Sequence, residues 1–181
     1  RQMSCPTHGD PPVRRVLTVG TDCSVGKMVT ALELRDAARR AGLKAAFAAT
    51  GQTGIMIEGW GIAIDRVIAD FAAGAAEWLV EQVADHEIVF IEGQGSITHP
   101  GYSGVTCALV HGSCPEALVL CHRPGRTAHE GVDDCPMVPV ERQVAIYEAM
   151  ANAVHPAKVV GIAVNTVGME EAAARQAVEE L

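Results

Sequence analysis

The segment VLTVGTDCSVGKMVT, residues 16–30, decides the fold that we expect for this chain. Its apolar run ends at Gly20, and after a short loop Gly26 and Lys27 stand where a helix is expected to begin. Glycines let successive backbone N–H groups converge on a phosphate, and a helix N-terminus with a lysine adds positive charge. The segment therefore predicts a phosphate-binding loop of the Walker A type, although one more residue separates its glycines than in the commonest pattern. A glycine-rich turn with an exposed lysine is the alternative.

The residue after this lysine is Met28, where a nucleotide hydrolase would place serine or threonine to hold magnesium. A thioether is a poor ligand for a hard cation, which prefers oxygen. Thr21, Ser24 and Thr30 carry hydroxyl groups, but none of them stands at the matching position. We therefore expect a ligand whose phosphates are bound and not cleaved, such as coenzyme A.

The composition limits the class of protein. Of 181 residues, 49% are hydrophobic and 4% aromatic, which favours one α/β domain with a core of small aliphatic side chains. The net charge of −8, without a long basic run, argues against a nucleic-acid partner. We expect a cytoplasmic protein with its six cysteines reduced, since the sequence shows neither a secretory signal nor an apolar stretch of membrane-spanning length.

Both ends of the chain predict a segment of a longer protein. Residues 1–13, which include PTHGDPP, have the composition of a linker from a missing N-terminal domain. At the other end, the helical pattern EEAAARQAVEEL runs to the last residue. We therefore expect a P-loop α/β domain over residues 14–181 that binds a small-molecule substrate, while homo-oligomerisation stays open.

Short apolar runs alternate with longer helical patterns, which is typical of a mostly parallel sheet with helices on both faces. This pattern predicts a three-layer, P-loop NTPase-like α/β fold. Right-handed crossovers bring the strand ends to one edge of the sheet, where glycines and polar residues form a ligand-binding edge. The expected strands are residues 15–19, 45–49, 88–92, 117–121 and 159–165, and the expected helices are residues 26–41, 65–84, 105–112, 141–154 and 170–181.

Two motifs resemble dethiobiotin synthetase and its relatives, which are amide-forming P-loop enzymes. These motifs are GTDCSVGK and, after an apolar strand, EGQGS. The resemblance implies that Glu92 helps to hold magnesium and that Asn165 contacts a nucleotide base. Met28 departs from it.

A longer set of motifs resembles a narrower family, the DgcN-type D-glutamate N-acetyltransferase-like proteins, formerly a domain of unknown function. The resemblance covers nearly all of residues 14–168 and includes GTDCSVGKMVTALEL, GQTGIMI and EGQGSITHP. It implies transfer of an acetyl group from acetyl-CoA to a D-amino acid such as D-glutamate, in D-amino-acid breakdown. An ATP- and magnesium-dependent ligase and a non-catalytic nucleotide-binding regulatory module are the alternatives.

The residues that we expect to bind the cofactor share a place in the phosphate loop or at the last strand end. They are Gly20, Thr21, Asp22, Cys23, Ser24, Val25, Gly26, Lys27, Met28 and Asn165. Cys23 is also a candidate nucleophile, because a helix N-terminus and a lysine are expected to lower the pKa of its thiol. A small packed side chain is the alternative for Cys23.

Acyl transfer to an amine needs a group that accepts a proton. Glu92 at the end of a buried strand is a candidate base or magnesium ligand, and a structural carboxylate is the alternative. His99, in a glycine-rich loop, is a candidate base or oxyanion donor, or else a structural hydrogen-bonding residue. Asp22 is a third catalytic candidate, or else it caps the following helix.

Two further sets of residues have the chemistry to bind a substrate. Arg123 and Arg126 suit a dicarboxylate such as glutamate, although an exposed loop explains them equally well. Hydrogen-bond donors at a neighbouring strand end come from Gln52, Thr53 and Gly54, where a tight turn is the alternative. No zinc site is expected from Cys121, His122, His129 and Cys135, because their spacing matches no standard pattern.

Overall fold

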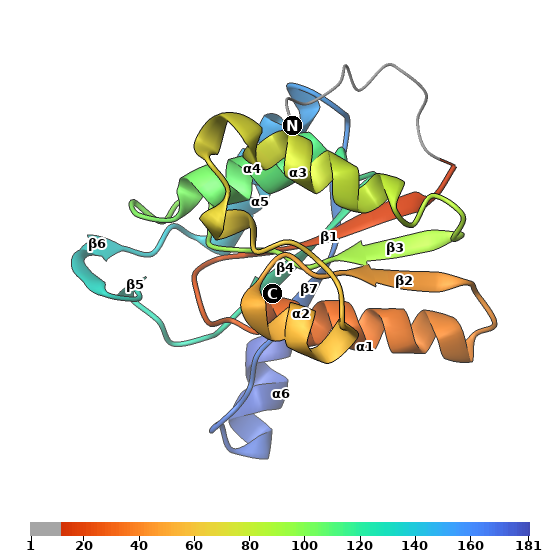
Figure 1. Cartoon of the computed structure of the whole chain (residues 1–181). Coiled ribbons are helices and arrows are strands. Elements are labelled where there is room, and N and C mark those ends of the chain that lie inside the picture. Colours follow the sequence, from red (N-terminus) through yellow and green to blue (C-terminus); the bar gives the residue numbers. More distant parts are fainter. Residues whose placement is uncertain (1–11) are drawn as a thin grey trace.

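The computed structural model describes residues 12–181, and its centre is a five-stranded sheet in the order β2-β3-β1-β4-β7 (Figure 1). Every neighbouring pair of strands is parallel. All five expected strands and the predicted α/β class are confirmed. The strands are β1 (Arg14–Gly20), β2 (Ala45–Ala48), β3 (Ile88–Ile91), β4 (Ala117–His122) and β7 (Lys158–Val164).

Helices cover both faces of this sheet (Figure 1). On one face, α3, α4 and α5 pack over an apolar cluster that includes Leu17 and Leu118. On the other face, α1 covers Phe47 and Phe90, and α2 and α6 lie on the same side (Figure 1). None of the helices within residues 12–181 is both long and apolar enough to cross a membrane. Their bounds are α1 (Lys27–Arg40), α2 (Gln52–Glu58), α3 (Ala69–Glu81), α4 (Ser103–Ser113), α5 (Val140–Asn152) and α6 (Glu171–Glu179).

The helix predicted over residues 65–84 is wrong at its start. The chain there forms a 3-10 turn, η1 (Ile64–Arg66), and α3 begins only at Ala69. Ile64 is buried in the core, and its N–H donates to the carbonyl of Thr50 after β2. Because this anchor holds the turn against the sheet, the chain must extend through Val67 before a helix can begin.

Two elements have no counterpart in the sequence prediction. Residues 52–58 form α2, so the tight turn that was the alternative for Gln52, Thr53 and Gly54 is wrong. After β4, a hairpin of β5 (Ala128–His129) and β6 (Val132–Pro136) projects beyond the sheet (Figure 1). Both elements are short and lack apolar periodicity, so their positions depend on contacts with distant segments.

Most of the predicted linker lies outside the described residues. Val13, its last residue, is buried in the core at 1% exposure. Val13, the residue immediately before β1, therefore packs as part of the domain.

Candidate functional site

A cleft opens at the edge of the sheet where the strands end. Its volume is ≈ 500 Å³, and its walls come from the phosphate loop, the start of α2 and the segment after β3. The ends of β1, β2 and β3 therefore meet in one cleft, as expected for a ligand-binding edge. The lining residues are Cys23, Ser24, Val25, Gly26, Lys27, Met28, Val29, Gly51, Gln52, Thr53, Glu92, Gly93, Gln94 and Gly95.

The phosphate loop places a buried amine in this cleft. Ser24 and Gly26 adopt left-handed φ angles of 54° and 100°, which turn the chain into α1 at Lys27. The Lys27 side chain folds back over the loop and donates to the carbonyl of Asp22 at 2.7 Å. A Cβ atom on Gly20 would lie 2.8 Å from the Lys27 Nζ, so the glycine leaves room for the lysine. Burial lowers the pKa of Lys27.

The position after the lysine has no oxygen ligand. Met28 lines the cleft and packs against the apolar cluster under α1. The hydroxyl of Thr21 lies 3.1 Å from the Nδ1 of His122, and that of Thr30 hydrogen-bonds with Cys121. Neither threonine therefore replaces the missing magnesium ligand.

Glu92 lies in the wall of the cleft as a buried carboxylate. Its Oε2 accepts the backbone N–H groups of Thr50 at 2.8 Å and of Gly51 at 3.0 Å. Burial raises the pKa of Glu92, and these two bonds only partly oppose that effect. A Cβ atom on Gly54 would collide with Oε2, so this glycine leaves space for the carboxylate. The GQTG segment and the EGQGS segment therefore pack against each other through the side chain of Glu92.

Asp22 is fully buried and joins the phosphate loop to the β5–β6 hairpin. Its Oδ2 accepts from the Nη1 of Arg126 at 2.6 Å and from the N–H of Glu130 at 2.9 Å. Its Oδ1 lies 3.2 Å from the Nδ1 of His129. Burial alone would raise the pKa of Asp22, but these bonds together lower it. Its expected alternative role as a helix cap is wrong, since α1 begins after Gly26 without a side-chain cap.

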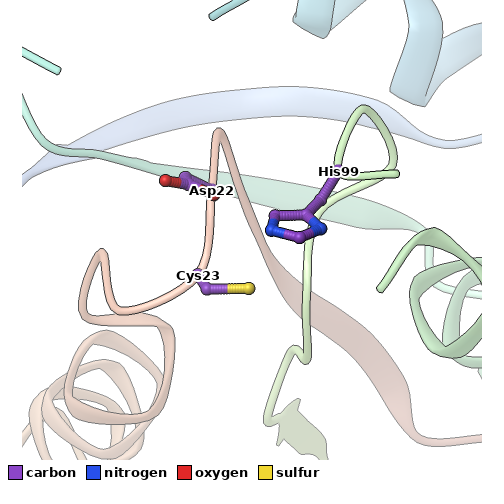
Figure 2. Close-up of side chains that lie close together, drawn as sticks. All are labelled: Asp22, Cys23 and His99. Carbon is purple, nitrogen blue, oxygen red and sulfur yellow. The ribbon is translucent and has the colours of Figure 1, made fainter. Parts of the chain in front are cut away.

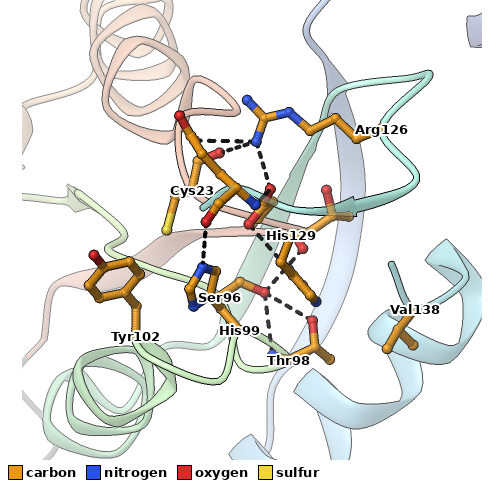
Figure 3. A network of polar contacts seen from close by, with 12 residues as sticks. Cys23, Ser96, Thr98, His99, Tyr102, Arg126, His129 and Val138 are labelled. Carbon is orange, nitrogen blue, oxygen red and sulfur yellow. Dashed lines mark hydrogen bonds and ion pairs between the residues drawn. The ribbon is translucent and has the colours of Figure 1, made fainter. Parts of the chain in front are cut away.

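Arg126 strengthens the connection between the phosphate loop and the β5–β6 hairpin. Besides Asp22, its Nη1 donates to the carbonyl of Cys23 at 2.8 Å (Figure 3). The guanidinium predicted to bind a substrate carboxylate is thus held against the phosphate loop. Arg123, the other predicted arginine, does not line the cleft, and its side chain forms no hydrogen bond or ion pair within residues 12–181.

His99 is buried behind the loop with both ring nitrogens engaged. Its Nδ1 accepts the N–H of Gly101 at 3.0 Å, so the proton must lie on Nε2, which donates to the carbonyl of Glu130 at 3.1 Å. Figure 2 shows His99 facing Asp22 and Cys23, and the ligating atoms of these three residues lie within 4.8 Å of one another. Because the oxygens of Asp22 and the nitrogens of His99 already have protein partners, this group does not need a metal to satisfy it.

Cys23 lines the cleft as a half-buried free thiol. Burial raises the pKa of Cys23 and outweighs the opposite effect of Lys27. The lowered pKa expected from the sequence is therefore wrong. The neutral thiol is the favoured form, which does not suit a nucleophile.

The other predicted binding residues divide between two cavities. Gln52 and Thr53 line the main cleft at the start of α2. Asn165 lies after β7 in a neighbouring cavity of ≈ 300 Å³, which it shares with Gly26 of the phosphate loop. Its Oδ1 accepts the N–H of Val167 at 3.1 Å, which orients the amide of Asn165.

Two buried residues of α5 support the loop and were not predicted from the sequence. The hydroxyl of Tyr147 donates to the carbonyl of Gly20 at 2.7 Å and accepts the N–H of Ile97 at 3.0 Å. Gln143 donates to the carbonyl of Thr21 at 3.3 Å. Burial raises the pKa of Tyr147 to about 12, so it remains a donor at neutral pH. Their only sequence signal is polar groups on an otherwise apolar helix face.

The comparison with known proteins decides the family. Residues 7–181 match a family model described as the P-loop domain of DUF1611, a domain of unknown function. This chain belongs to the DUF1611 family. A crystal structure of a DUF1611 family protein from Anabaena variabilis is 47% identical with a TM-score of 0.90, over 93% of this chain and 50% of that chain.

A curated relative of this DUF1611 chain is the D-glutamate N-acetyltransferase of Tritonibacter scottomollicae. The two are 52% identical over 165 residues, which are 89% of this chain and 49% of the relative. The chain thus spans about half the length of the curated relative, and the resemblance seen in the sequence motifs is confirmed.

P-loop proteins with little sequence identity to the DUF1611 domain share its fold. Cobyrinic acid a,c-diamide synthase from Mycobacterium smegmatis, with bound ADP and magnesium, has a TM-score of 0.60 at 11% identity, over 93% of this chain and 80% of that chain. This likeness confirms the predicted P-loop NTPase-like fold.

Proposed function

We propose that this site serves the transfer of an acetyl group from acetyl-CoA to the amine of a D-amino acid such as D-glutamate, in D-amino-acid breakdown. The observation that carries the proposal is the cleft itself, where a phosphate-loop lysine is followed by a thioether and not by a magnesium ligand. Such a cleft suits a ligand whose phosphates are bound and not cleaved. The name of the curated relative supports the reaction.

The phosphates of coenzyme A would lie against the loop from Gly20 to Lys27. Two glycines that lie beside the Lys27 side chain in space support this placement. A Cβ atom on Gly20 or Gly93 would press on that side chain. The adenine would occupy the neighbouring cavity beside Asn165. ATP carries the same base, so this cavity by itself does not distinguish the two ligands.

Glu92 would accept a proton from the attacking amine. An ammonium group must lose one proton before it attacks, and a second leaves the nitrogen as the N–C bond forms and the C–S bond breaks. Glu92 would take one of these protons, and the leaving sulfur of CoA would take the other. A carboxylate with a raised pKa is well matched to this task near neutral pH.

The remaining predicted catalytic residues would act by positioning. The lone pair of the His99 Nδ1 is committed to the N–H of Gly101, so the ring has no nitrogen left to accept a proton. Asp22 and Arg126 would fix the shape of the phosphate loop through the hairpin.

An ATP- and magnesium-dependent ligase is the second candidate. The solved structure with bound ADP and magnesium shares the fold, and Glu92 follows β3 beside the phosphate loop. The residues fit a magnesium ion poorly, because Met28 supplies no oxygen and one oxygen of Glu92 is committed to two backbone N–H groups. A regulatory module would bind a phosphate ligand without turnover.

Release of free CoA thiol from acetyl-CoA tests the proposal in the full-length protein, with D-glutamate and L-glutamate compared in the presence of EDTA. We expect release with the D-isomer without ATP or magnesium. Lys27→Ala should weaken CoA binding by about ten-fold or more, because a buried charge-assisted contact is lost. Lys44→Ala, at an exposed ion pair with Asp85, is the matched control. ATP consumption without thiol release would favour the ligase.

A further inference from the structure

A second pocket adjoins the main cleft and is not used by the account of phosphate binding. Its volume is ≈ 220 Å³. Pockets that bury drug-sized ligands measure roughly 300–1,000 Å³, so this pocket suits a smaller molecule. It shares part of its wall with the main cleft, so the two cavities are neighbours. The residues that line it are Cys23, Asp65, Gln94, Gly95, Tyr102 and Val105.

The two cavities differ in their charged side chains, since the main cleft holds a lysine beside the carboxylate of Glu92 and the second pocket holds a carboxylate without a lysine or arginine among the residues that line it. Lys27 is the cation of the main cleft, whereas the charged side chain of the second pocket is the carboxylate of Asp65. Within residues 12–181, this carboxylate forms no ion pair or hydrogen bond with another side chain or with the backbone. It is thus available to a cationic ligand.

The fold fixes the place of this carboxylate. Asp65 lies in the turn η1, between Ile64 and Arg66. The buried side chain of Ile64 and its bond to the Thr50 carbonyl hold this turn against the sheet. The side chain of Asp65 is itself exposed, so it is the anchored backbone of the turn that fixes its position.

We propose that this second pocket is the acceptor pocket, in which Asp65 binds the ammonium group of the amine substrate. The inference deepens the proposed acetyl transfer and rests on it. An amine held there would face the main cleft across Cys23, Gln94 and Gly95, which both cavities share. Tyr102 and Val105 supply an apolar wall for the methylene groups of an amino acid.

Cys23 lines both cavities and would therefore lie at the border between the acetyl donor and the acceptor. Its thiol has a raised pKa, so it would separate the two ligands as a small neutral group. Acetyl transfer would then run directly from the thioester to the amine, without an acetylated cysteine.

Steady-state kinetics of the full-length Asp65→Asn variant test the acceptor pocket. We expect the KM for D-glutamate to rise about ten-fold or more, because an ion pair is lost, while the Kd of CoA changes less than about two-fold. Asp65→Glu keeps the charge and should recover part of the effect. Asp70→Asn, an exposed aspartate in the first turn of α3, is the matched control. An unchanged KM for D-glutamate, or an equal loss of CoA binding, would overturn the assignment.

Failure of the proposed function would be seen separately. Wild-type protein that releases no CoA thiol with either isomer would refute acetyl transfer, whatever Asp65 does. Calorimetric titration with D-glutamate then tests the pocket without turnover. Binding that is lost in Asp65→Asn would support the acceptor pocket, whereas equal binding or no binding to the wild type would overturn it.

Discussion

Glu92 is the residue on whose chemistry the proposed acetyl transfer depends most. Replacing it by glutamine keeps an oxygen that accepts the N–H groups of Thr50 and Gly51, but removes the proton acceptor. We expect Glu92→Gln to fold normally and to lose about 10²–10⁴-fold in kcat, the usual contribution of a general base.

The pH profile provides a second readout for the same variant. Since burial raises the pKa of Glu92, wild-type kcat/KM should fall as the pH drops through a value above the ordinary range of glutamate. The Glu92→Gln variant should lack this acidic limb. Glu87→Gln, at the opposite end of β3, is the matched control. An unchanged rate with the limb intact would exclude Glu92 as the base.

Local spacing made part of the site predictable at the level of residues. The phosphate loop and Glu92 follow from glycines, a lysine and a carboxylate at strand ends. The bond from Arg126 to Asp22 joins residues that are 104 positions apart, and no local pattern encodes it. The raised pKa of Cys23 likewise depends on burial by distant segments.

At the level of elements, the packing of α3 against α4 depends on one glycine. A Cβ atom on Gly112 in α4 would collide with the backbone of Ala73 in α3. We expect Gly112→Ala to lower the free energy of unfolding by about 1–3 kcal/mol, because the two helices must separate.

Gly104, near the start of the same helix, is the control for this effect. A Cβ atom there meets nothing within 4 Å. Gly104→Ala should therefore stabilise the protein by up to about 1 kcal/mol through helix propensity. Urea unfolding of both variants measures the two values. Equal effects would show that the helix contact does not decide the cost.

Strands were easier to predict than connections for a physical reason. Strands β1 to β4 are largely buried and therefore appear as short apolar runs, and the edge strand β7 is a similar apolar run although none of its residues is fully buried. The start of α3 and the identity of α2 depend on tertiary anchors, such as the bond from Ile64 to Thr50. The hairpin is held by Asp22 and has no apolar pattern of its own.

At the level of the whole molecule, Asp22 links the stability of the domain to pH. Its pKa lies below the ordinary value of 3.8, so its bonds stabilise the fold fully above that pH. This contribution should be lost as the pH falls through the lowered pKa of the folded state. Arg126→Met should destabilise the domain by about 1.5–3 kcal/mol at pH 7, because a charge-assisted bond is removed from a buried carboxylate.

Unfolding measured as a function of pH tests this linkage. The difference between wild type and Arg126→Met should shrink as the pH falls through the lowered pKa of Asp22 in the folded wild type, because the carboxylate that Arg126 stabilises is then protonated. Arg175→Met, which removes an exposed ion pair with Glu171, should leave stability unchanged and serves as the control. A difference that stays constant with pH would show that Asp22 is not the partner that matters.

The most direct test of the central claim is a calorimetric titration of CoA in EDTA and in excess magnesium, with ATP compared under both conditions. We expect CoA to bind with the same Kd, within about two-fold, whether or not magnesium is present, since Met28 leaves the loop without a metal ligand. Met28→Thr should instead make ATP binding depend on magnesium. Wild-type binding that requires magnesium, with ATP preferred over CoA by about ten-fold or more, would contradict it.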